Sequence, residues 1–327
     1  MRAQILQLLR ENFGQYVSGE DLSRRLAVSR TAVWKHIRAL KDEGYEVEGH
    51  SRLGYRLLSV PDLLLPGEIV PGIRTRWLGH AVYYCDEVDS TNSRAKKLAA
   101  DGCPHGQIVI AETQTGGRGR LARGWFSPYA RGIWLSVVLR PPFSPREAPK
   151  CTMLAAVAVN RAIRKVSGVA CGIKWPNDIL YDNRKIVGIL TEMSAEIDAI
   201  NYVVIGMGIN VNSRAEEFPP ELAKAATSLL IAGGRPVSRK ELLAAVLGEL
   251  EGLYDKTVLQ GFAPVLEAWR AETVTLGRTV DVFSSGQTFS GLAVDIDDEG
   301  GLLVETSTGL ERVIAGDVSV RARRGDK

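Results

Sequence analysis

The sequence predicts an α+β protein with a helical N-terminal domain, a central mixed α/β domain and a small all-β C-terminal domain. Apolar residues recur at helical spacing within residues 1–43, which indicates short packed helices. Short β-branched runs alternate with helical segments between residues 83 and 270, and four β runs separated by glycine-containing turns follow. We therefore divide the chain into domains at residues 1–60, 61–270 and 271–327.

Composition is that of an ordinary globular protein, with 45% hydrophobic and 24% charged residues among 327. The net charge of +3 is too small to mark the whole chain as a nucleic-acid binder, so such a role must lie in a local patch. The N-terminus has no apolar signal core and no later stretch approaches a membrane span, so we expect a cytoplasmic protein without membrane contact. Four scattered cysteines argue against a metal site and favour reduced thiols.

The N-terminal domain is predicted to contain three helices. Four apolar residues share one face of the first helix: Ile5, Leu8, Leu9 and Phe13. Ser18 caps a second helix over residues 18–26. A three-residue turn leads to a third helix over residues 30–43, whose apolar face carries Val33, Ile37 and Leu40.

Basic residues occupy the opposite face of the third helix, and residues 45–57 follow it as a β-hairpin wing. A helix, a short turn and a second helix with basic residues outward is the helix-turn-helix arrangement, in which the later helix enters the DNA major groove. We therefore predict an operator DNA partner; a helical protein-interaction domain is the alternative. The candidate DNA contacts are Ser29, Arg30, Thr31, Lys35 and Arg38.

A segment rich in glycine and arginine, residues 112–128, lies between β runs at 107–111 and 133–139 and is called here the Gly/Arg segment. Its glycines let backbone N–H groups approach a ligand closely, and its arginines match phosphate or carboxylate oxygens. The spacing fits neither a Walker A loop nor a dinucleotide fingerprint. We expect a loop at the end of a sheet that wraps an anion; an RNA-binding tract and a merely solvated hairpin loop are the alternatives.

Other polar groups and glycines lie near predicted strand and helix ends. Ser90, Thr91 and Asn92 begin a helix, where they cap it or bind a small polar ligand. An alanine-rich buried helix over residues 148–166 precedes two strands at 172–180 and 183–192. In the second of these strands Lys185 projects at the start and Gly188 leaves space for something lying on the sheet. A last strand at 202–212 carries two glycines and an Asn, where a flat ring can pack against bare backbone.

Residues 238–270 are predicted to be helical, and the C-terminal domain then contains β runs at 274–283, 287–295, 302–306 and 311–320.

Five motifs in this order resemble those of biotin protein ligases. They are Ser-Thr-Asn at 90–92, Gly-Arg-Gly-Arg-x-x-Arg at 117–123, Lys-Trp-Pro-Asn-Asp at 174–178, Arg-Lys-x-x-Gly-Ile-Leu at 184–190 and Gly-x-Gly-Ile-Asn at 206–210. With the helix-turn-helix in front, the chain is similar over essentially its full length to the bifunctional bacterial members, which also repress biotin synthesis genes. The resemblance implies a winged helix-turn-helix, a catalytic domain of the biotin/lipoate ligase type and an SH3-like barrel.

The resemblance also implies an ATP-dependent, AMP-forming ligase. Such enzymes join biotin and ATP into biotinyl-5'-AMP and pass biotin to a lysine of a biotin carboxyl carrier protein. Biotin and ATP are then substrates, with Mg²⁺ expected alongside ATP. The implied partners are the carrier domain, operator DNA and, once biotinyl-AMP is bound, a second copy of the chain.

Residue roles carry over motif by motif. The residues implied for biotin are Ser90, Thr91, Asn92, Gln114, Arg118, Gly119, Arg120, Lys185 and Gly188. Those implied for ATP or the adenylate are Arg118, Arg120, Arg123, Trp125, Asn177, Lys185, Ile209 and Asn210. Those implied for catalysis are Arg118, Lys185 and Asp178, the last orienting the attacking lysine or a Mg²⁺. Leu121-Ala122 departs from relatives that often carry another basic residue there, which bears on how tightly the adenylate is held.

The chemistry agrees with this assignment. A carboxylate does not react with an amine at neutral pH, so activation is needed, and bringing two anions together requires fixed cations. A ligand-sensing transcription factor without turnover and a lipoate ligase are the alternatives. We also expect the closed Gly/Arg segment to strengthen dimerisation through a sheet edge near residues 186–191.

Overall fold

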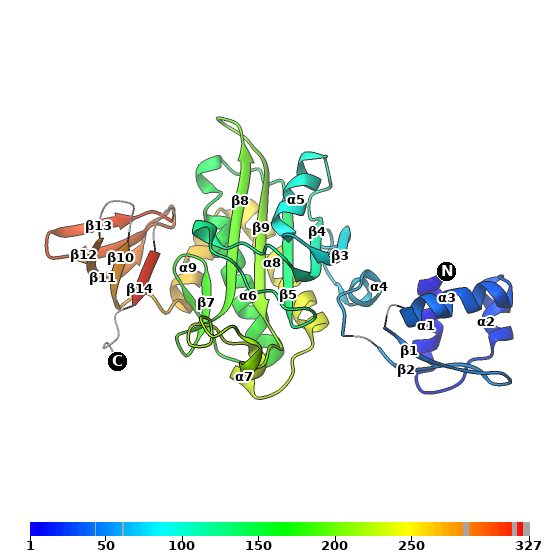
Figure 1. Ribbon diagram of the computed structural model, residues 1–327. Helices are drawn as coiled ribbons and strands as arrows, with labels where there is room; N and C mark the ends of the chain where they lie inside the picture. The colour runs from blue at the N-terminus through cyan, green and yellow to red at the C-terminus, as the bar shows by residue number, and fades with distance from the viewer. Residues whose placement is uncertain (43, 61, 284–287, 316–318, 323–327) are drawn as a thin grey trace. The chain divides into compact units, whose positions relative to one another are not determined.

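The computed structural model describes residues 1–42, 44–60, 62–283, 288–315 and 319–322 (Figure 1). By its contacts the chain divides into two compact units, Met1–Leu63 and Leu64–Lys327. The further division at residue 270 stays a prediction. Within the described residues, no helix has both the length and the apolar character that crossing a membrane requires.

The N-terminal unit is a winged helix-turn-helix. It contains the helices α1 (Arg2–Glu11), α2 (Gly19–Leu26) and α3 (Arg30–Asp42), followed by the antiparallel hairpin β1 (Glu46–His50) and β2 (Gly54–Ser59). Ser18 caps α2 by accepting from the Glu20 amide at 3.2 Å, and Ser29 accepts from the Ala32 amide at 3.2 Å. Ala27, in the left-handed region with φ of 53°, makes the turn between α2 and α3.

Most of the predicted helical core is observed, with one error. Val33, Ile37 and Leu40 are buried on α3. The expectation that Phe13 belongs to the core is wrong, because α1 ends at its C-cap Asn12 and Phe13 is 54% exposed. Leu6, one position from the predicted stripe, is buried instead.

Within the described residues of the second unit, seven strands form the central sheet in the order β3-β4-β5-β9-β8-β7-β6. Only β3 and β4 run parallel; the other neighbours are antiparallel. The strands are β3 (Val82–Val88), β4 (Ile108–Gln114), β5 (Gly132–Leu139), β6 (Gly172–Lys174), β7 (Asp178–Tyr181), β8 (Arg184–Ala195) and β9 (Ile200–Asn210). The prediction that the Gly/Arg segment joins two strands is confirmed, and the structure shows that these strands, β4 and β5, are antiparallel neighbours.

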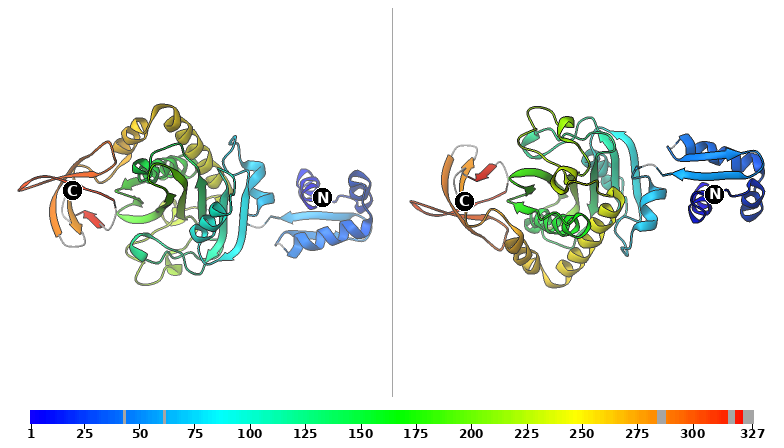
Figure 2. Two further views of the ribbon diagram at one scale, coloured as in Figure 1. Left: turned by 90° about the horizontal axis from the view of Figure 1, so that it is seen from above. Right: turned by 90° about the horizontal axis from the view of Figure 1, so that it is seen from below.

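Helices cover the two faces of this sheet unequally. α6 (Lys150–Ser167) and α8 (Arg239–Gln260) pack on one face and form the main core with alternate residues of the strands (Figure 1, Figure 2). α5 (Thr91–Ala100) lies on the other face, where its alanines pack against Val109, Val138 and Val204. Because α5 is short, part of this second face is left for a cavity.

Shorter elements complete the unit. They are α4 (Pro66–Ile69), α7 (Leu229–Gly233) and α9 (Ala263–Glu272), with 3-10 turns η1 (Val70–Gly72), η2 (Arg120–Ala122), η3 (Pro145–Glu147) and η4 (Ala215–Glu217). The helical segment predicted over residues 238–270 is observed as two helices. α8 ends at Gly261, whose φ is 74°, and Pro264 in the first turn of α9 starts a new helix.

The C-terminal strands form an antiparallel sheet in the order β13-β12-β11-β10-β14. They are β10 (Thr279–Phe283), β11 (Thr288–Ile296), β12 (Leu302–Thr306), β13 (Gly309–Val313) and β14 (Ser319–Ala322). The β run expected at 311–320 therefore spans parts of two strands, and residues 316–318 lie outside the described residues. Arg270 on α9 pairs with Asp295 at 2.7 Å, and the Trp175 indole N–H donates to the Gly300 carbonyl at 3.1 Å.

Candidate active site

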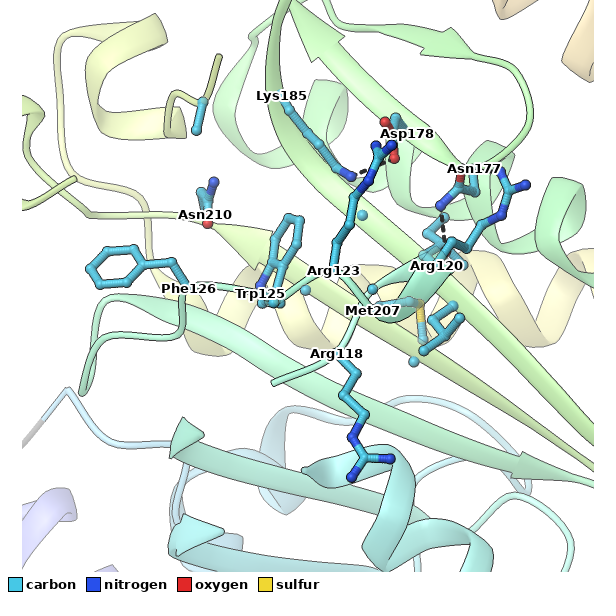
Figure 3. A pocket seen from close by; sticks show the side chains of 18 of the residues that line it. Arg118, Arg120, Arg123, Trp125, Phe126, Asn177, Asp178, Lys185, Met207 and Asn210 are labelled. Atoms are coloured by element: carbon cyan, nitrogen blue, oxygen red, sulfur yellow. Dashed lines mark hydrogen bonds and ion pairs between the residues drawn. The ribbon is translucent and has the colours of Figure 1, made fainter. Parts of the chain in front are cut away.

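A cavity of about 270 Å³ opens on the sheet face that α5 covers only in part (Figure 3). Its walls come from α5, the Gly/Arg segment, β7, β8, β9 and the loop after β9. It brings together fourteen of the fifteen ligand-binding and catalytic residues predicted from sequence. These are Ser90, Thr91, Asn92, Gln114, Arg118, Gly119, Arg120, Arg123, Trp125, Asn177, Asp178, Lys185, Gly188 and Asn210.

Ile209 is the exception among the predicted ligand-binding residues. Its side chain is fully buried in the main core and does not line the cavity. The reason is the alternation of a strand, since Gly208 and Asn210 face the cavity and the residue between them must face α6 and α8. A side-chain contact from Ile209 to a ligand in this cavity is therefore excluded in the described conformation.

The α5 end of the cavity, called here the polar end, is lined by the uncharged side chains of Ser90, Thr91, Asn92 and Gln114, which belong to a hydrogen-bonded network. Ser90 is the N-cap of α5, and its hydroxyl accepts from the Ser93 amide at 3.4 Å. The Thr91 amide and hydroxyl both donate to the Gln114 side-chain oxygen, at 2.9 and 3.1 Å. The Gln114 amide nitrogen donates in turn to the Ser127 hydroxyl at 2.9 Å. Each link fixes a side chain that a ligand can contact.

Three residues of this network escaped the sequence analysis: Ser127, Ser136 and Glu192. Ser136 on β5 is fully buried, with its hydroxyl 2.8 Å from the Thr91 hydroxyl and 2.6 Å from Oδ1 of Asn92. The Asn92 amide nitrogen donates to Glu192 at 2.9 Å. A signal for Ser136 was present, because it is a lone polar residue in the apolar run 133–139 and a buried hydroxyl needs a partner.

The floor of the cavity is bare backbone. Gly206 faces Asn92, and a Cβ there would lie 2.1 Å from Oδ1 of that side chain. Gly188 and Gly208 are directly opposite each other on β8 and β9. A Cβ on either would lie 2.6 or 2.4 Å from the indole of Trp125, so these two positions exclude larger residues. The flat ring predicted to pack on this strand is therefore, in this structure, the protein's own Trp125.

The other end of the cavity gathers positive charge and is called here the cationic end. Lys185 pairs with Asp178 at 2.6 Å, and its ammonium lies 5.1 Å from the centre of the Trp125 ring. Arg120 donates to Oδ1 of Asn177 at 3.1 Å, while the Asn177 amide donates to the Ile189 carbonyl at 2.8 Å.

The arginine side chains of the Gly/Arg segment point in different directions (Figure 3). Arg123 extends toward the side that holds Lys185 and Asp178, whereas Arg118 extends the opposite way. Among the described residues that line the cavity, Asp178 carries the one carboxylate, and it shares this end with Arg120, Arg123 and Lys185. An excess of cations over acids around a cavity favours an anionic ligand.

One wall of the cationic end comes from the loop after β9, to which the sequence analysis assigned no role. Phe218, Leu222, Ala225 and Ala226 line the cavity there. The loop is held by backbone bonds, from the Lys185 amide to the Ala225 carbonyl at 2.8 Å and from the Thr227 amide to the Lys185 carbonyl at 2.9 Å. The Asn210 side chain donates to the Thr227 carbonyl at 3.1 Å, which fixes its orientation.

The described residues contain no group of three or more His, Cys, Asp or Glu side chains arranged to hold a metal ion. Burial raises the pKa of the Cys151 and Cys171 thiols to about 12, so neither is a thiolate at neutral pH. Neither cysteine lines the cavity, and the described residues that do line it offer cations and hydrogen-bonding groups.

The fold and the cavity together define a class: a winged helix-turn-helix protein that carries a small-molecule site for a polar, acidic ligand. Comparison with known proteins gives the family. Residues 2–56 match a helix-turn-helix domain, residues 84–210 match the biotin/lipoate A/B protein ligase family, and residues 275–321 match the biotin protein ligase C-terminal domain.

Full-length relatives agree. The bifunctional ligase/repressor BirA of Bacillus subtilis is 41% identical over 98% of this chain and 98% of its own. BirA of Escherichia coli is 30% identical over 94% of each chain. Among solved structures, the biotin protein ligase of Aquifex aeolicus in complex with biotin and ATP aligns with a TM-score of 0.67 at 29% identity, covering 75% of this chain and 100% of that one. The chain belongs to the family of bifunctional biotin protein ligase/repressors, which confirms the family predicted from the five motifs.

Proposed function

We propose that the chain activates biotin with ATP in this cavity and transfers the biotinyl group to a lysine of a carrier domain. The ureido head of biotin binds at the polar end, against Ser90, Thr91, Asn92 and Gln114. Its carboxylate then reaches the cationic end, where ATP binds. One observation supports this most: a single cavity runs from an uncharged hydrogen-bonding network to a cluster of cations.

The nucleotide is assigned to the cationic end. Arg120, Arg123 and Lys185 carry the charge that two approaching anions need, since a carboxylate and a triphosphate otherwise repel each other. Asn210 and Trp125 are the proposed contacts for the adenine ring, which would pack near the indole that covers Gly188 and Gly208. Arg118 extends away from Lys185 and Asp178, so its proposed contact is with the side of the adenylate nearer to biotin.

The proposed reaction has two steps. A carboxylate oxygen of biotin attacks the α-phosphorus of ATP, and pyrophosphate leaves with the electrons of the broken P–O bond. The uncharged amine of the carrier lysine then attacks the acyl carbon, loses a proton, and AMP leaves. Lys185 neutralises the phosphate in both steps, and once its ammonium turns from Asp178 to the phosphate, the Asp178 carboxylate is available to accept the lysine proton.

Mg²⁺ is expected with the nucleotide, and the residues present fit it. Mg²⁺ keeps several waters and is held by one or two carboxylates together with substrate phosphates. Asp178 is the carboxylate at the cationic end and its side chain is 20% exposed, so it can reach a phosphate-bound ion. The ion would neutralise phosphate charge there.

The N-terminal unit is proposed to bind operator DNA. Ser29, Arg30, Thr31, Lys35 and Arg38 are all exposed at the turn before α3 or on its outer face. Arg30 pairs with Glu20 at 2.7 Å, but both side chains are more than 70% exposed, so the pair is weak and yields readily to a phosphate. The N-terminal unit and the ligase unit would act in the cytoplasm, where DNA and the carrier are both present.

A homodimer on the operator remains part of the proposal, with a change to its surface. We expected a free sheet edge near residues 186–191. This expectation is wrong for residues 186–188, because β7 pairs with residues 184–188 of β8. β8 continues to Ala195 beyond the end of β7, and Met193 on this extension is 49% exposed. The proposed dimer surface is therefore this extension of β8, and the adenylate should strengthen the dimer by about 1–3 kcal/mol.

The test is incubation of the pure protein with ATP, a carrier domain and either labelled biotin or labelled lipoate. The proposal predicts biotin-dependent pyrophosphate release and label on one carrier lysine. Label from lipoate alone would instead identify a lipoate ligase. Tight adenylate binding with no label on the carrier would identify a ligand-sensing regulator without turnover.

A further inference from the structure

The outward face of α3 carries a large aromatic side chain among its basic ones. Trp34 is 50% exposed, although most tryptophans of globular proteins are largely buried. It lies one turn after Thr31 and one turn before Arg38, roughly 90° around the helix from the buried stripe of Val33, Ile37 and Leu40. The exposed indole therefore lies on the flank of α3, next to Arg38 and Thr31 of the set assigned to DNA.

The surroundings of Trp34 are cationic. The guanidinium carbon of Arg38 lies 5.8 Å from the centre of the Trp34 ring, within the range of a cation–π contact. No acidic residue occurs between residues 29 and 41. A protein partner with an apolar surface would have to leave these cations without counter-charges, whereas the DNA backbone supplies a phosphate on either side of the groove.

We propose that Trp34 reads sequence by packing against the 5-methyl group of a thymine in the major groove, while its ring holds Arg38 toward the same groove. The thymine methyl is the apolar group that the major groove presents, and it distinguishes thymine from every other base. The inference rests on the proposed operator binding and goes further, since it assigns a base preference to a residue outside the predicted contact set.

The experiment uses the full-length protein with biotin and ATP, and a pool of random-sequence duplex DNA from which bound sequences are selected. In the selected duplex each thymine is then replaced singly by uracil, which removes only the methyl group. For the wild type, we expect one position in each half-site at which uracil weakens binding roughly fourfold, the effect of losing one buried methyl. In Trp34→Ala the same replacement should have no effect, while Trp34→Phe should keep part of it.

Phe13→Ala is the matched control, because Phe13 is an equally exposed aromatic of the same unit, 54% exposed, that lies beyond α1 and off this face. It should leave the uracil profile unchanged. An identical uracil profile in the wild type and in Trp34→Ala would overturn the inference. This holds even if Trp34→Ala changes the self-association of the protein, because the inference concerns the contact with the thymine methyl group. If the wild type enriches no sequence, operator binding itself fails and the inference fails with it.

Discussion

The two ends of the cavity are built differently. At the polar end, Ser136 is fully buried, Thr91 is 4% exposed and Asn92 is 6% exposed, and each is hydrogen-bonded to another side chain. At the cationic end Arg123 is exposed, and the Gly/Arg segment that carries it is closed largely by its own backbone bonds, such as the one from the Gly119 amide to the Arg123 carbonyl at 2.7 Å.

Charge explains this difference. Uncharged donors and acceptors satisfy one another before a ligand arrives, so a site for a neutral head group can be buried and fixed in advance. Cations cannot be buried together without an anion, because each loses hydration and repels its neighbours. We infer that the polar end is formed in the free protein and that the cationic end closes only around the charges of its ligands.

The largest effect is expected from Lys185→Ala. Removing the ammonium leaves the developing phosphate charge less stabilised, so biotin-dependent pyrophosphate release should slow by about 10²–10³-fold. Biotin binding alone should change little if the two ends are independent. Lys165→Ala, at a surface lysine with a 70% exposed side chain, is the control. A loss of biotin affinity as large as the loss of rate would break the division into two ends.

Ser136→Ala tests the polar end. The substitution removes a buried hydroxyl from Thr91 and Asn92 and should cost about 1–3 kcal/mol, roughly 5- to 150-fold in biotin affinity if the network holds the ureido head. The rate at saturating biotin should fall much less. Calorimetric titration with biotin, together with the pyrophosphate assay, measures both. Unchanged affinity in a folded variant would separate this network from the ligand.

Arg118→Gly should act on retention of the intermediate rather than on its formation. A lost charge-assisted contact of about 1.5–3 kcal/mol predicts an adenylate that dissociates at least roughly tenfold faster. The released adenylate should then label lysines of a bystander protein. Equal dissociation rates and equal carrier selectivity in variant and wild type would count against the assigned contact.

The smallest effect on activity is expected at a buried carboxylate far from both ends. Burial tends to raise the pKa of Glu251, but the backbone N–H groups of Arg76, Trp77 and Leu78 and the Arg76 charge outweigh it and lower the pKa below its usual value. The stability that this group contributes is therefore complete above the unfolded-state pKa and is lost as the pH falls through the lower folded-state pKa.

At pH 7 Glu251→Gln should accordingly unfold at a lower denaturant concentration than the wild type. The difference in unfolding free energy between the two proteins should narrow below about pH 4, because the wild-type carboxylate becomes protonated there and loses its charge. The rate of pyrophosphate release by folded protein should not change. A gap that is constant from pH 7 to pH 3 would mean that the charge of Glu251 contributes nothing.

Short sequence patterns predicted several local features of the structure. Ser18 and Ser90 were found as helix caps, and the glycines and arginines of residues 112–128 predicted an anion-binding loop between two strands. These features depend on neighbours in the sequence, which is why they were accessible. The split between α8 and α9 was also encoded locally, by Gly261 and Pro264, and was overlooked.

The remainder depends on contacts between distant residues. Glu192 meets Asn92 across 100 positions, and the loop after β9 reaches the cavity only because its backbone pairs with Lys185. The position of Trp125 on Gly188 and Gly208 follows from the register of β8 and β9, which sequence alone did not give.

Amide hydrogen exchange tests the difference between the two ends most directly. It would be followed in the free protein, with biotin, and with biotin plus ATP. The account predicts that residues 133–138, behind the polar end, are protected in all three states. Residues 117–126 should exchange quickly in the free protein and at least roughly tenfold more slowly once the adenylate has formed. If the amides of residues 117–126 were strongly protected from exchange in the free protein, and biotin and ATP did not change this protection, the claim that the cationic end closes only around its ligands would be contradicted.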